Sequence, residues 1–100
     1  PVWPMGIIGS IAHSSDICLA AISRSQRYAA IGIDIEPDVP LPPEIAAEVV
    51  HEGDGVELES GTAPLTSLHH IAVFSAKEAA YKCQFPLTGS VLGFDALSIR

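Results

Sequence analysis

The feature that most constrains the fold is the stretch of residues 65–84, which contains neither glycine nor proline. Such a stretch favours a helix, because glycine and proline are the residues that most often end one. Its small and apolar side chains also recur at helical spacing, and at 100° per residue they share one arc: Val73, Ala76, Ala80 and Cys83. We therefore expect the principal helix of the chain here, ended by Pro86 and Gly89.

The first part of the chain carries strand patterns instead. Residues 17–23 are a short apolar run typical of a strand, and residues 29–36 alternate, with Ile31, Ile33 and Ile35 on one face. The polar turn at residues 24–27 between them predicts a hairpin. Residues 1–15 are expected to form an extended, partly buried lead-in.

The remaining segments are shorter. Residues 44–50 predict a short helix, and Pro43 suits its first turn. Residues 51–61 are rich in glycine and carboxylates, which predicts a loop and the least ordered part of the chain. Residues 91–99 alternate enough to predict a closing strand. The expected fold class is α+β, with a short antiparallel sheet packed against one long helix.

Length and composition limit what such a chain can be. One hundred residues allow a single domain, residues 1–100, and an apolar content of 48% favours a folded chain. The formal net charge of -7 argues against binding to nucleic acids. The longest apolar run extends only from Ile17 to Ile22, far below the ~20 residues of a membrane-spanning helix.

The chain start and the two cysteines bear on location. Cys18 and Cys83 lie far apart in the sequence and form no metal-binding motif, so we expect two buried, reduced thiols. No secretory leader is visible at Pro1, and together these features predict a cytoplasmic protein. A start at Pro1 also leads us to expect a processed or excised part of a larger protein.

The sharpest chemical feature is a pair of carboxylates, Asp34 and Glu36. Residues two apart on a strand project from the same face at a separation of about 6.6 Å, close enough to share one hard cation such as Mg²⁺. Gly32 on that face leaves room beside them. Taken alone, the pattern is more often an ordinary solvated face of a strand.

A second feature lies on the predicted long helix. Glu78 and Lys82 are four residues apart on its polar side, where a surface ion pair is the commoner outcome, and Lys77 lies between the two faces. If the helix brings Glu78 to Asp34 and Glu36, three carboxylates and a lysine converge. That arrangement would suit Mg²⁺ and a phosphorylated substrate.

Histidine patterns are less informative. Ser10, His13 and Asp16 do not indicate a hydrolase triad, because residues three apart in an extended segment face opposite ways. A lone histidine such as His13 is more often structural. The other histidines, His51, His69 and His70, predict no metal-binding pair.

Three motifs occur in an order that resembles a known family. WPMGIIGSIAH at residues 3–13, IGIDIE at 31–36 and FSAKEAAYK at 74–82 are similar to the three motifs of the 4'-phosphopantetheinyl transferases. The continuation CQFPLTGSVLGFDAL resembles most the enterobactin synthetase component D branch of that family. The resemblance extends over nearly the whole chain.

The resemblance implies a Mg²⁺-dependent enzyme that transfers the phosphopantetheine arm of coenzyme A to a serine of an apo acyl or peptidyl carrier domain. A role in siderophore or nonribosomal peptide synthesis fits the branch. Residue by residue, the metal ligands implied are Asp34, Glu36 and Glu78. Glu78 and Lys82 are the implied catalytic residues, as general base and as the group that stabilises the leaving phosphate. The coenzyme would contact His13, Lys77 and Lys82.

Alternatives remain open. Members of this branch have two similar halves, so this chain is expected to be the motif-bearing part of a larger enzyme. It could be catalytically incomplete and only bind coenzyme A or the carrier protein, or it could be a metal-dependent phosphohydrolase. The charge of -7 opposes attraction of acidic ligands, so another part of the protein, or self-association, would have to complete the site.

Overall fold

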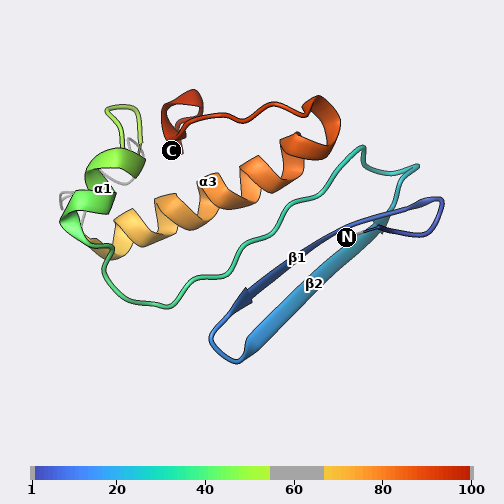
Figure 1. The fold of residues 1–100 in the computed structure, drawn as a ribbon, viewed down its shortest axis with the longest axis horizontal. Helices are drawn as coiled ribbons and strands as arrows, with labels where there is room; N and C mark the ends of the chain where they lie inside the picture. Colours follow the sequence, from blue (N-terminus) through green and yellow to red (C-terminus); the bar gives the residue numbers. More distant parts are fainter. Residues whose placement is uncertain (1, 55–66, 100) are drawn as a thin grey trace. The chain divides into compact units, whose positions relative to one another are not determined.

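The computed structural model describes residues 2–54 and 67–99, and the side chains from residue 70 onward in the second range. They form an α+β structure with two antiparallel strands, two α-helices and one 3₁₀ turn (Figure 1). The chain divides into two compact units. We call Pro1–Pro37 with Glu78–Val91 the hairpin unit, and Asp38–Lys77 with Leu92–Arg100 the helical unit.

The sheet is a hairpin of β1 (Ile7–Ser14) and β2 (Ile17–Arg24). The strand expected at residues 17–23 is confirmed, but its partner is the segment that we expected to be a lead-in. Ser15 has a φ of 52°, which lets the chain reverse in a short turn. Alternation along β1 buries Ser10 and Ala12 and exposes the other face, which carries His13.

The strand predicted at residues 29–36 is wrong, because this segment has no regular secondary structure. Its backbone instead lies against the second half of the long helix. A Cβ added to Gly32 would lie 2.6 Å from the backbone nitrogen of Cys83 and would also meet the carbonyl oxygen of Ala79. The Ile33 N–H donates to the Ser10 hydroxyl over 3.1 Å. The segment is therefore held between β1 and the helix by contacts other than a strand ladder.

The long helix, α3, spans Ser67–Thr88 and confirms the principal helix expected from the sequence. It continues through Pro86, which lies in the last turn, and stops only before Gly89. Gly89 has a φ of 67° and donates its N–H to the carbonyl oxygen of Phe85 over 2.8 Å. A glycine in this left-handed conformation is the usual end of a helix. Val73 is buried, as the apolar arc predicts.

The short helix α1 spans Pro43–Val49, close to the prediction, with proline in its first turn. Leu41, Ala46 and Val49 form the buried core of the helical unit. Partly buried residues complete this core: Val50, Ile71, Phe74 and Phe94. No helix in the described part of the chain has both the length and the apolar character to cross a membrane.

The closing strand predicted at residues 91–99 is also wrong. The segment contains a 3₁₀ turn, η1, at Phe94–Ala96. Its Phe94 ring lies 6.0 Å from that of Phe74, and its backbone groups bond to side chains of the helical unit. Side-chain partners thus replace a neighbouring strand. The expectation of two buried thiols fails for Cys18, which is exposed on β2, whereas Cys83 is half-buried.

Candidate functional site

The candidate site lies in the hairpin unit, where α3 meets the segment before Pro37. Lys82 of α3 places its Nζ 3.2 Å from a carboxylate oxygen of Asp34. The lysine side chain is 32% exposed and that of Asp34 only 8%. Lys82 also lies 3.4 Å from the carbonyl oxygen of Ile11 on β1. Among the described residues its ion pair is thus with Asp34, rather than along the helix with Glu78.

The pKa of Glu36 reflects the closeness of the acidic side chains. Burial, a hydrogen bond with Asp34, and repulsion by the carboxylates of Asp34 and Glu78 raise the pKa of Glu36 from 4.5 to about 7. Lys82 acts in the opposite direction, because its positive charge favours the ionised form. The structure therefore brings four of the predicted site residues together, and Glu36 carries a proton for part of the time at neutral pH.

Carboxylate oxygens are the ligands that Mg²⁺ prefers, so the chemistry of this donor set fits the ion. Within the described residues, however, no group of three or more histidine, cysteine, aspartate or glutamate side chains has the arrangement of a ready metal site. Mg²⁺ often takes only one or two carboxylates and fills its other positions with water and phosphate. The hydrogen-bonded pair of Asp34 and Glu36 meets that smaller requirement, and the full three-ligand set stays a prediction.

Ser10 has a role that sequence reasoning missed. Its hydroxyl is buried and accepts the Ile33 N–H, which fixes the chain just before Asp34. Ser10 and His13 lie on opposite faces of β1, in agreement with the rejection of a hydrolase triad. His13 is exposed on the face away from the Ser10 bond, so the structure does not bring it to the acids. Its predicted contact with coenzyme A stays a prediction.

Lys77 lies in the helical unit and is buried there. Its ammonium group makes three hydrogen bonds, to the carbonyl oxygens of Val49 at 2.8 Å and Phe94 at 2.6 Å and to Asp54 at 2.7 Å. An ammonium has three donors, so all are used. The side chains of Lys77 and Asp54 are 3% and 0% exposed. The predicted contact of Lys77 with coenzyme A stays a prediction, and this geometry gives the residue a structural role.

Asp54 is the second residue that the sequence did not reveal. It lies in the segment expected to be the least ordered, yet it is buried and accepts hydrogen bonds from Lys77, His51 and Ile99. Burial by itself would raise the pKa of Asp54, but these hydrogen bonds outweigh it and hold the pKa below its ordinary value. The loop predicted here is confirmed for residues 51–54, which form a turn, and residues 55–61 lie outside the described part.

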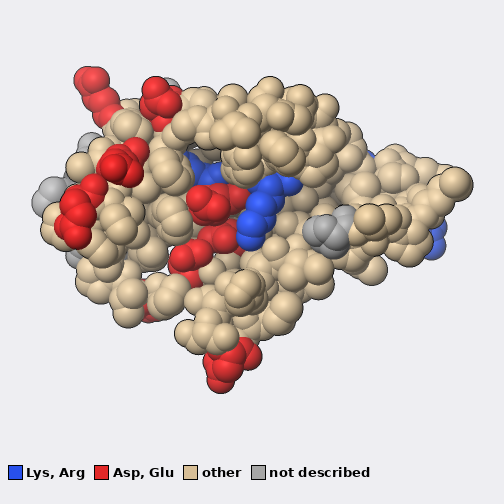
Figure 2. Space-filling view, viewed as in Figure 1, with Lys and Arg blue, Asp and Glu red and all other residues tan. Residues whose placement is uncertain are grey.

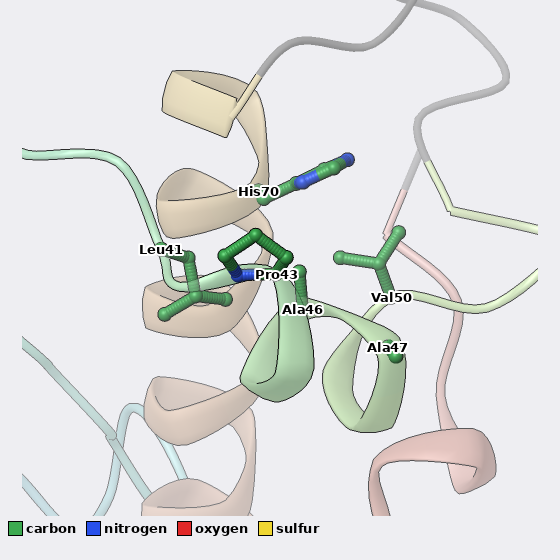
Figure 3. Close-up of a pocket in the computed structure, with 6 residues that line it drawn as sticks. All are labelled: Leu41, Pro43, Ala46, Ala47, Val50 and His70. Carbon is green, nitrogen blue, oxygen red and sulfur yellow. The ribbon is translucent and has the colours of Figure 1, made fainter.

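The helical unit also has a hollow of about 430 Å³ beside α1 (Figure 3). His70 comes from α3, and the other lining residues come from α1 and its flanks: Leu41, Pro43, Ala46, Ala47 and Val50. Among the described residues, the lining is apolar apart from the imidazole. None of the predicted catalytic or metal-binding residues lines this hollow.

Comparison with known proteins gives the family. A family model described as the 4'-phosphopantetheinyl transferase superfamily matches residues 30–100, and one described as the 4'-phosphopantetheinyl transferase N-terminal domain matches residues 1–23. The chain is 38% identical over 96 residues to 4'-phosphopantetheinyl transferase Svp of Streptomyces mobaraensis, which covers 95% of this chain and 39% of that protein.

Two further relatives agree. The chain is 34% identical over 95 residues to 4'-phosphopantetheinyl transferase PptT of Mycobacterium tuberculosis, covering 95% of this chain and 41% of that protein. It is 34% identical over 101 residues to enterobactin synthase component D of Salmonella typhi, covering 99% of this chain and 41% of that protein. The chain thus spans about two fifths of the length of these relatives. Since the superfamily model matches well over half of it, this chain belongs to the 4'-phosphopantetheinyl transferase superfamily.

Proposed function

We propose that this chain carries the acidic and cationic centre of a 4'-phosphopantetheinyl transferase, which moves the 4'-phosphopantetheine arm of coenzyme A to a serine of an apo carrier domain. The observation that carries the proposal is the 3.2 Å pair between Lys82 and Asp34, with Glu36 and Glu78 close by. A phosphoryl transfer needs this combination, because carboxylates can hold a divalent ion and a lysine can neutralise phosphate charge.

In the proposed reaction, the serine oxygen of the carrier domain forms a bond to the phosphorus that bears the pantetheine arm. The bond from that phosphorus to the bridging oxygen breaks, and adenosine 3',5'-bisphosphate leaves. Glu78 accepts the serine proton as general base. Lys82 stabilises the negative charge that develops on the leaving phosphate, and its side chain, one-third exposed, is accessible to a ligand.

Asp34 and Glu36, with Glu78, would hold Mg²⁺ in this proposal. When bound, Mg²⁺ would supply positive charge to the pyrophosphate oxygens. Ser10 is a positioning residue in this proposal, because its hydroxyl accepts the Ile33 N–H and so holds the segment that carries Asp34 and Glu36. Asp34 is largely buried beside Lys82, and a pair in such a setting interacts more strongly than it would in bulk water.

The substrate assignment rests on the family. One of the relatives is an enterobactin synthase component, which supports carrier domains of siderophore or nonribosomal peptide synthesis as the acceptors. A cytoplasmic location and self-association belong to the same proposal. The alternative is a chain that binds coenzyme A or a carrier domain without turnover, and it is favoured by the two-fifths coverage of the relatives.

Mass spectrometry tests the proposal. An apo carrier domain is incubated with the chain, coenzyme A and Mg²⁺, and the expected result is a mass gain of one phosphopantetheine arm that EDTA prevents. The Asp34→Ala variant should show no gain, and Asp16→Asn, which removes an exposed acid in the hairpin turn, is the matched control. If a longer form of the protein transfers the arm and this chain does not, the binding-only alternative holds.

A further inference from the structure

The turn after β2 has the opposite charge character from the rest of the chain. The full sequence holds twelve acidic and five basic residues, and carboxylates predominate on the face shown in Figure 2. Two of the five basic residues, Arg24 and Arg27, lie within this one turn. Lys77 and Lys82 are each paired with a carboxylate, whereas no ion pair among the described residues involves Arg24 or Arg27.

Backbone hydrogen bonds fix the shape of the turn. The carbonyl oxygen of Arg24 accepts the N–H of Arg27 over 3.0 Å and that of Tyr28 over 3.5 Å. The Ser25 N–H donates to the carbonyl oxygen of Gly6 over 2.9 Å, which ties the turn to the residue before β1. The two arginines are therefore carried on a closed turn anchored to the hairpin.

The same turn forms a hollow of about 560 Å³, lined by Ser23, Arg24, Gln26 and Arg27. Its described lining residues are two arginines, a serine and a glutamine, and no aspartate or glutamate is among them. Guanidinium groups bind phosphate oxygens through two parallel hydrogen bonds, and hydroxyl and amide groups add further donors.

We propose that this hollow binds the phosphate group of a small phosphorylated molecule, at a site separate from Asp34 and Lys82. The phosphate would lie between Arg24 and Arg27, with Ser23 and Gln26 as additional donors. Because the chain carries a net charge of -7, long-range attraction does not favour an anion. Binding here depends on short-range hydrogen-bond geometry, which favours a bidentate oxyanion over a simple monovalent one.

The test is a titration of the isotope-labelled chain with inorganic phosphate at constant ionic strength, followed by ¹H–¹⁵N NMR. We expect saturable shifts at the amide and side-chain signals of Ser23, Arg24, Gln26 and Arg27. The Arg24→Gln/Arg27→Gln variant should lose them. The Arg24→Lys/Arg27→Lys variant keeps the charge, and its dissociation constant should rise about five-fold or more, as expected for the loss of at least one hydrogen bond.

Three outcomes would overturn the proposal. The first is a response that does not saturate or that chloride reproduces, which would indicate general anion attraction, and the second is an equal response to acetate, which would show that the site does not prefer phosphate to a carboxylate. The third is an unchanged dissociation constant in the double lysine variant, because charge alone would then explain binding. Residue-resolved signals separate this site from phosphate bound near Lys82, so either proposal can fail without the other.

Discussion

Lys82 of α3 and Asp34 of the preceding extended segment form an ion pair of 3.2 Å across 48 positions of the chain. The pair joins two motifs that are separate in the sequence, and Glu36 and Glu78 are close enough to influence one another beside it. It is the relationship on which the proposed chemistry depends.

The Lys82→Met variant should reduce turnover more than it weakens substrate binding. A lysine that stabilises developing phosphate charge acts mainly in the transition state, so kcat should fall by about 100-fold while KM for coenzyme A changes less. Steady-state kinetics of carrier modification measure both constants. An increase in KM with kcat unchanged would assign Lys82 to binding alone, and Lys82→Arg, which keeps the charge, is the matched comparison.

In the Asp34→Ala variant the rate of transfer should fall by about 100-fold or more while the chain stays folded. The substitution removes an expected ligand of a cation that stabilises the transition state by several kcal/mol. Its ion pair partner is partly exposed, so the cost in unfolding free energy should be small, about 1 kcal/mol or less. Urea unfolding and the transfer assay are run on the same preparation. Full activity in this variant would contradict the metal assignment.

The Gly32→Ala variant should both destabilise the hairpin unit and disturb the site. The added Cβ would lie 2.6 Å from the Cys83 nitrogen and would meet the Ala79 carbonyl oxygen, so the segment carrying Asp34 must move away from α3. We expect a loss of about 1 to 3 kcal/mol in unfolding free energy. The exposed Ala29→Val is the control, and equal stability of the two variants would refute the close approach of this segment to the helix.

The Asp54→Asn variant tests the buried pair in the helical unit. Asp54 has a lowered pKa in the folded state, so its contribution to stability is present above its ordinary pKa of 3.8 and is lost as the pH falls through the lower folded value. At pH 7 the free energy of unfolding of the variant should be lower by about 3 to 5 kcal/mol, because the Lys77 charge stays buried without its charged partner.

Urea unfolding at pH 7 and near pH 2.5 measures this dependence. The gap in unfolding free energy between the unmodified chain and Asp54→Asn should narrow on acidification, because the stability that a carboxyl with a lowered pKa contributes decreases as the pH falls below 3.8. Asp16→Asn, at an exposed position, should show no comparable gap at either pH. A gap that stays constant with pH would contradict the charged pairing of Asp54 with Lys77.

The sequence was most informative where a local pattern decides the structure. The helix over residues 65–84 and the strand over 17–23 were predicted because periodicity and the lack of breakers act locally. Residues 29–36 alternate like a strand, but Gly32 contacts the backbone of α3 and the Ile33 N–H bonds to a side chain. Tertiary contacts override the alternation there.

Only part of the site was predictable from the sequence. Spacing placed Asp34 and Glu36 on one side of an extended segment, and the two carboxyl groups do share a hydrogen bond. The burial of Asp54 depends on Lys77, 23 positions away, and nothing near Asp54 in the sequence signals that contact. The structural use of Lys77 was missed for the same reason, since its position on the helix does not show what covers it.

The most direct measurement of the central claim is where a divalent ion binds. Mn²⁺ prefers the same oxygen ligands as Mg²⁺ and broadens the NMR signals of nearby residues. Titrated into the labelled chain, it should broaden the amide signals of Asp34, Glu36 and Glu78 first, and excess Mg²⁺ should restore them. Broadening that begins at exposed acids such as Glu44 and Glu48, or that Mg²⁺ does not reverse, would contradict a Mg²⁺ site beside Lys82.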